Sequence, residues 1–192
     1  MNRGVPGRVL VAIVLALVAG FFETQATADQ RAVRYRTFAD PAGRFTLEVP
    51  NEWIAITGAG AGAVTVVERS GAATVAVEAV RLQTPLAPDQ VTDLFSQLEV
   101  EIVTERQPTA SGVQATMVEL NGLRVIVIDF SRRGVNGAER VRQYSVPRGG
   151  SLFRVTCQVP QESFARYEGI CVHAGQSFRP GPVPVAPPGR GR

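Results

Sequence analysis

The chain has 192 residues, of which 45% are hydrophobic and 19% charged, and its formal net charge is +3 at pH 7. This size and composition are typical of one globular domain with additional end segments. The small net charge and the lack of a nucleic-acid-binding motif disfavour DNA or RNA as a partner. All 20 basic residues are arginines, which indicates a general compositional bias rather than selection for one ligand.

The N-terminus has the pattern of a secretory signal peptide. Arg3 and Arg8 precede an apolar run of 14 residues, Val9–Phe22, and small residues up to Ala28 form a cleavage site. A membrane-spanning helix needs about 20 apolar residues. We therefore expect residues 1–28 to be cleaved and the protein to be secreted or periplasmic. Membrane contact would then come only from weak association or from an uncleaved signal.

The first part of the expected domain is rich in strands. Residues 38–49 predict two strands joined by a turn, and the second strand alternates between apolar and polar residues before Pro50. The glycine-rich segment Gly58–Ala63 predicts a flexible loop. It is not a phosphate-binding loop, because the β-branched residues Val64–Val67 follow it where a helix would be required. A second hairpin is expected over residues 64–82.

A helix is expected over residues 88–104, with Pro88 in its first turn. Its apolar residues recur at helical spacing and predict a stripe that packs on the core. That stripe consists of Val91, Leu94, Phe95, Leu98 and Ile102.

Four consecutive strands are expected over residues 114–159, joined by turns at Asn121-Gly122, at residues 134–137 and at residues 148–150. The strand Leu123–Phe130 is apolar on both faces, which is typical of a strand that is covered on both sides. A helix over residues 161–174 is one candidate cover. The proline-rich residues 180–192 predict a disordered tail.

Cys157 and Cys171 are the only cysteines in the chain. An even number of cysteines in an exported protein indicates a disulfide. A redox pair and a metal site are the alternatives. Their spacing is not Cys-x-x-Cys, and the single histidine, His173, cannot complete a set of four ligands with them. We expect neither a metal nor another cofactor.

Possible reactive and binding residues are few. His173 could serve a serine-type hydrolase, but Ser145, Ser151 and Ser177 lack a nucleophile-elbow sequence. Arginines are frequent in the second half of the four-strand segment. Arg140 and Arg142 share one face of a strand, and Arg154 is a possible neighbour across the hairpin, so these three are the candidate site for an anionic partner. An ordinary solvated surface is the alternative interpretation.

Three segments carry a family resemblance: the opening segment Gly43–Trp53, the late hairpin Gln143–Thr156, and the closing residues Phe164, Tyr167, Ser177 and Phe178. Together they resemble the PsbP-like fold of small bacterial exported proteins, chloroplast-lumen accessory proteins and Mog1-type Ran-binding proteins. The resemblance covers about residues 37–179, with the domain itself expected over residues 35–179. It implies an α+β fold in which helices sandwich an antiparallel sheet of six or more strands.

Members with this fold are mostly non-enzymatic accessory or binding modules, and the LpqN-type envelope lipoproteins are bacterial examples. This chain lacks the lipid-attachment cysteine of that type. The resemblance therefore implies an exported, non-catalytic module of the cell envelope that holds a protein or an amphipathic, lipid-like small molecule. The expected site is the sheet surface or a cleft beside Gly58–Ala63. The alternative is a serine-type hydrolase centred on His173.

Overall fold

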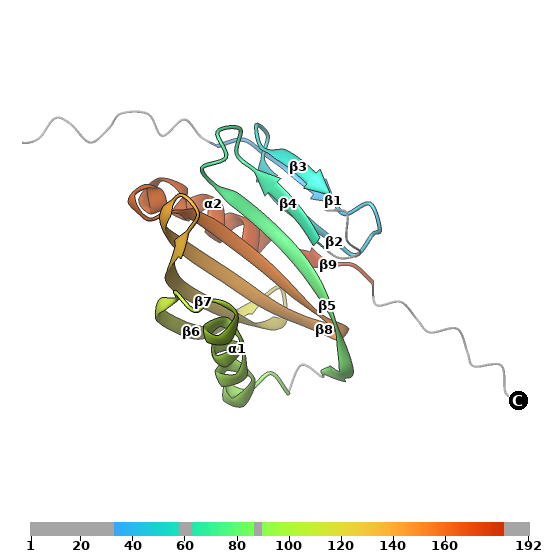
Figure 1. Ribbon diagram of the computed structural model, residues 1–192. Coiled ribbons are helices and arrows are strands. Elements are labelled where there is room, and N and C mark those ends of the chain that lie inside the picture. Colours follow the sequence, from blue (N-terminus) through green and yellow to red (C-terminus); the bar gives the residue numbers. More distant parts are fainter. Residues whose placement is uncertain (1–32, 58–62, 87–89, 183–192) are drawn as a thin grey trace, which may run out of the picture. The chain divides into compact units, whose positions relative to one another are not determined.

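The computed structural model describes residues 33–57, 63–86 and 90–182. The expected signal peptide, most of the glycine-rich loop, Pro88 and the last ten residues of the tail lie outside the described residues. From Arg34 onward the described residues belong to one compact unit (Figure 1). Its elements are β1 (Tyr35–Ala39), β2 (Phe45–Pro50), β3 (Ile54–Thr57), β4 (Ala63–Val67), β5 (Thr74–Leu86), α1 (Asp93–Arg106), β6 (Ser111–Leu120), β7 (Leu123–Gly134), β8 (Gly137–Pro160), the 3-10 turn η2 (Gln161–Ser163), α2 (Phe164–Ser177) and β9 (Arg179–Pro180).

The strands form two antiparallel sheets. The larger sheet has six strands in the order β3-β4-β5-β8-β7-β6, and the smaller has three in the order β1-β2-β9. This arrangement confirms the expected α+β class with a sheet of six or more strands. The hairpin predicted over residues 38–49 forms the first two strands of the smaller sheet. Its third strand was not predicted, because that strand comes from the far end of the chain and has only two residues.

The long element β8 folds back on itself. Its first half pairs with β7 and its second half with β5. The Arg132 side chain donates hydrogen bonds to Glu139 at 2.9 Å and to Gln158 at 2.5 Å. In a straight strand those two partners would be about 60 Å apart. Gly149, with a φ of 57°, lies at the predicted turn between the halves. The prediction of four strands over residues 114–159 is therefore confirmed.

Both faces of the larger sheet are covered. One face is covered by the α1 segment, which here means α1 with the residues just before it. This segment packs Val91, Phe95 and Val103 on alternate residues of β7, including Ile126 and Ile128. On the other face, residues of α2 and β2 pack against the sheet in a second cluster. The apolar strand Leu123–Phe130 thus lies between two buried layers, as its sequence predicted. Strand β2 contributes to the second layer together with the helix.

The α1 segment buries Val91 and Phe95 as predicted, but its buried side differs from the prediction farther along the helix. Helix α1 begins at Asp93 rather than near Pro88, and Leu98 is 49% exposed whereas Glu99 is only 1% exposed. The predicted stripe was therefore wrong at Leu98; the Leu94 side chain is outside the described part. The physical reason is that Glu99 has buried partners on the sheet, namely Ser145 at 2.6 Å and Arg154 at 2.9 Å. A carboxylate with such partners can replace an apolar residue at a buried position.

Helix α2 buries the side that its sequence predicted, with Tyr167, Ile170, Cys171 and Ala174 facing the core. After it, β9 pairs Pro180 with Phe45. Within the described ranges, neither helix has the length and apolarity needed to cross a membrane.

Candidate functional site

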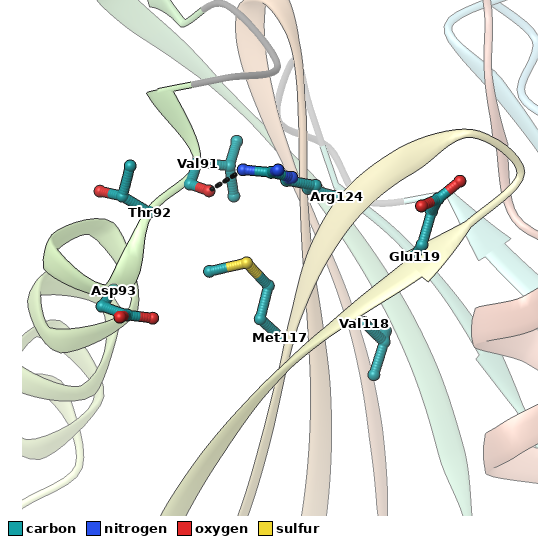
Figure 2. Close-up of a pocket in the computed structure, with 7 residues that line it drawn as sticks. All are labelled: Val91, Thr92, Asp93, Met117, Val118, Glu119 and Arg124. Carbon is teal, nitrogen blue, oxygen red and sulfur yellow. Dashed lines mark hydrogen bonds between the residues drawn. The ribbon is translucent and has the colours of Figure 1, made fainter.

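An open groove of about 470 Å³ lies between the start of α1 and the β6–β7 hairpin (Figure 2). We call it the α1 groove. Its lining residues are Val91, Thr92, Asp93, Met117, Val118, Glu119 and Arg124.

The β6–β7 hairpin forms one wall of the α1 groove. Asn121 and Gly122 have φ values of 56° and 73°, as a tight turn with two left-handed residues requires. In the resulting register Glu119 is opposite Arg124. Figure 2 shows Met117 and Arg124 pointing toward the α1 segment, whereas Glu119 points away from it. The helix begins only at Asp93, so it leaves this end of the sheet face open.

The chemistry of the α1 groove is mixed. Val91 is 1% exposed and Met117 is half-buried, so together they provide an apolar floor. The Arg124 guanidinium donates one long hydrogen bond of 3.5 Å to the Val91 carbonyl oxygen. It forms no ion pair with any residue in the described part of the chain. Asp93 and Glu119 place carboxylates at the rim, so the groove combines one available cation with a small apolar surface.

The three candidate arginines do not form one site. Arg142 makes a two-point contact with Asp129 at 2.8 and 3.2 Å. Arg140 and Arg142 both lie over the Phe164 ring, at 5.6 and 5.8 Å from its centre. Side chains along β8 alternate between the two faces of the sheet. Arg154 therefore lies on the opposite face, under α1 and beside Glu99. The sequence correctly paired Arg140 with Arg142, but it contained no signal for the burial of Arg154.

Arg154 belongs to a buried polar network. Its Nε and Nη2 groups donate to the Glu99 carboxylate at 3.2 and 2.9 Å, and the side-chain exposures are 7% for Arg154 and 1% for Glu99. Ser145 also donates to Glu99, and Gln143 donates to Ser145 at 3.3 Å. The Arg154 Nη1 atom is buried without a hydrogen-bond partner in the described residues. This network joins α1 to the sheet and is closed to solvent.

A second pocket of about 410 Å³ brings His173, Ser177 and Glu48 together. His173 Nε2 lies 2.7 Å from a Glu48 oxygen, and the imidazole stacks at 3.8 Å on Tyr35. Burial and then the nearby Glu48 charge raise the pKa of the Tyr35 hydroxyl. The Ser177 hydroxyl donates to the Ala174 carbonyl and accepts from the Glu48 backbone N–H. No hydrogen bond joins Ser177 to His173 in the described residues, so a serine–histidine pair is not assembled here.

The two cysteines are joined, with a Cα–Cα distance of 5.4 Å between Cys157 on β8 and Cys171 on α2. The bond connects the closing helix to the sheet. Among the residues that the structure describes, no group of three or more His, Cys, Asp or Glu side chains could hold a metal ion.

Comparison with known proteins establishes the fold and nothing finer. No protein-family model matches the chain, and no curated protein matches it by sequence. Among solved structures, cyanobacterial PsbP (CyanoP) from Synechocystis sp. PCC 6803 is 12% identical over 82% of this chain and 98% of its own, with a TM-score of 0.58. LpqN of Mycobacterium tuberculosis, a protein involved in cell envelope biogenesis, is 12% identical over 79% and 92%, with a TM-score of 0.51. The fold is therefore PsbP-like.

Proposed function

We propose that the protein is an exported, non-catalytic accessory module of the cell envelope that holds an amphipathic small molecule in the α1 groove. The observation that carries this proposal is the Arg124 guanidinium, which lies without an ion-pair partner in the described residues beside the apolar floor of Val91 and Met117. The apolar part of a ligand would cover that floor, and an anionic or acceptor-rich head would accept hydrogen bonds from Arg124.

Two observations support export. The Cys157–Cys171 disulfide suits an oxidising compartment outside the cytoplasm. The first 28 residues have the charge and hydropathy pattern of a secretory signal. The fold similarity to LpqN is consistent with an envelope role, since that protein is involved in envelope biogenesis.

The size of the groove predicts weak binding. Covering on the order of 100 Å² of apolar surface, counted over the groove and the ligand together, contributes about 2.5 kcal/mol, and a charge-assisted hydrogen bond contributes about 1.5–3 kcal/mol. A sum near 4 kcal/mol corresponds to a dissociation constant of about 1 mM. The carboxylates of Asp93 and Glu119 reduce the attraction for a multiply charged anion. A single-headed amphiphile is therefore the best match.

The proposal is tested by titration with sodium decanoate, an amphiphile with a single negative charge, below its micelle concentration, followed by calorimetry or NMR. Arg124→Gln should weaken binding at least about tenfold, because it removes a hydrogen bond from a charged group, which contributes about 1.5–3 kcal/mol, and about 1.4 kcal/mol is a factor of ten in the dissociation constant. Arg133→Gln is the matched control, because Arg133 is also exposed but lies on the other β7 end, away from the groove. Equal affinity of the wild type and the Arg124 variant would overturn the proposal.

Native mass spectrometry of protein purified from its own host adds an independent test. A co-purifying amphiphile that is lost in Arg124→Gln supports the proposal. A protein crosslinked through the groove would instead favour the protein-holding form of the module. Turnover of a simple ester that is lost in His173→Ala would favour the hydrolase and contradict a non-catalytic role.

A further inference from the structure

The pocket around His173 has a chemistry that differs from that of the α1 groove. We call it the His173 pocket. It lies between the outer face of the β1–β2–β9 sheet and the end of α2, and its lining residues are Thr37, Thr46, Leu47, Glu48, His173, Gln176, Ser177 and Arg179. Alternation along β2 buries Phe45, Leu47 and Val49 and turns Thr46 and Glu48 outward. Seven of these eight residues have polar side chains.

The pocket carries charges of both signs. Glu48 has a side chain that is 44% exposed, and His173, which is 35% exposed, occupies only one of its two carboxylate oxygens. Arg179 uses Nη1 to hold the carbonyl oxygens of Gln176 and Phe178. Its other guanidinium N–H groups have no partner in the described part of the chain. For an anion or a cation entering the pocket, the attraction of one of these charges is offset by the repulsion of the other.

The uncharged groups offer both donors and acceptors. The hydroxyls of Thr37 and Thr46 and the side-chain amide of Gln176 form no hydrogen bonds with other described residues. A hydroxyl or an amide can donate and accept at once, whereas a carboxylate only accepts and a guanidinium only donates. The ligand groups that match such a mixture are hydroxyls, because each one also donates and accepts.

The lining is held in place before any ligand arrives. The backbone N–H of Glu48 donates to the Ser177 hydroxyl at 3.0 Å, and its carboxylate lies against His173 at 2.7 Å. The Tyr35 ring packs on the other side of that imidazole. These contacts reduce the ordering cost of binding at Glu48 and His173.

We propose that the His173 pocket binds a neutral saccharide unit. The opposite charges of Glu48 and Arg179 offset each other and give no net preference for an anion or a cation. Leu47 is the one apolar side chain in the lining, which disfavours an alkyl chain, and the donor–acceptor mixture matches adjacent sugar hydroxyls. This site is separate from the α1 groove, so it goes beyond the function proposed above. An exported protein with both sites would contact an amphiphile and a glycan through different surfaces.

His173 itself supplies the reporter, because it is the only histidine in the chain. Its ring C–H proton signals can be followed by NMR while maltose or N,N′-diacetylchitobiose is added. We expect a saturable shift with a dissociation constant of about 1–10 mM, as suits a shallow open site. Absence of a saturable shift up to about 50 mM of either disaccharide would overturn the proposal.

Matched variants separate binding from structural effects. Thr37→Val and Gln176→Ala remove hydrogen-bonding groups but retain the Glu48–His173 pair, and each should weaken saccharide binding about fivefold, close to 1 kcal/mol. Gln114→Ala, on the distant strand β6, should leave it unchanged. Equal binding by all three variants, or the same saturable shift with sodium phosphate, would contradict the saccharide site. Arg124→Gln should not affect this titration, so failure here is distinguishable from failure of the groove proposal.

Discussion

Replacing Glu99 by Gln, or Arg154 by Met, should destabilise the protein far more than an ordinary surface substitution. The Glu99 and Arg154 side chains are 1% and 7% exposed and share two hydrogen bonds, at 2.9 and 3.2 Å. Each single change leaves a charge buried without its counterion. Breaking a buried pair in this way costs about 3–5 kcal/mol. Since small domains have a total stability of about 5–15 kcal/mol, either variant would lose a large share of its free energy of unfolding.

The double variant Glu99→Gln/Arg154→Met distinguishes burial of charge from loss of packing. With both charges removed, its free energy of unfolding should exceed the value expected from adding the two single-variant losses by about 2 kcal/mol or more. Equilibrium urea unfolding of the four proteins, with the disulfide intact, measures this coupling. The matched control is Asp129→Asn, which breaks the more exposed Arg142–Asp129 pair and should cost about 1 kcal/mol or less. Single variants that each lose under about 1 kcal/mol, or effects that add without coupling, would refute the buried network.

Three further predictions concern stability. The double variant Cys157→Ser/Cys171→Ser should lose about 3 kcal/mol of its free energy of unfolding, because the unfolded chain gains the freedom of an open loop. The two positions are 14 residues apart in sequence. A lower urea midpoint would show the loss. Gly175→Ala should cost about 1–3 kcal/mol in thermal unfolding, because its Cβ would overlap the Tyr144 ring, whereas Gly150→Ala has no neighbour there and should be nearly neutral. The Arg44 side-chain hydrogen bonds hold the pKa of Asp40 below its ordinary value despite burial. The stabilisation from the ionised Asp40 is therefore fully present above the pKa of about 4 that Asp40 has in the unfolded chain. It is lost as the pH falls through the lower pKa of Asp40 in the folded protein. Asp40→Asn should flatten the acid side of the stability curve, and an unchanged curve would contradict this.

The expected elements agree with the structure where a local pattern determines them. Asn121-Gly122 predicted a tight turn because few residue pairs adopt positive φ at both central positions, and the structure has such a turn there. The alternation in β2 and the doubly apolar strand in β7 also identified the buried faces correctly. These patterns depend on residues that are close in sequence.

The residues of the candidate functional sites were harder to predict from the sequence. The expected arginine cluster assumed that Arg154 lies beside Arg140 and Arg142, but it lies under α1 with Glu99. The α1 groove was not anticipated, because its floor joins Val91, which lies just before α1, to Met117 from a strand that follows the helix. A helix that starts five residues later than expected leaves this end of the sheet face open. The start of a helix depends on packing as well as on propensity.

The sequence by itself determined the turns, the strand alternation, the disulfide pair and the general plan of a sheet between helices. Backbone dihedral preferences and short periodicities are properties of neighbouring residues, so they can be read along the chain. The tertiary structure alone decided that Glu99 and Arg154 are buried together, that Arg124 lies beside an apolar floor without an ion-pair partner among the described residues, and that His173 meets Glu48. The partners in that last pair are 125 residues apart. Charge, burial and reactivity depend on such distant neighbours, and no local pattern encodes which ones will meet.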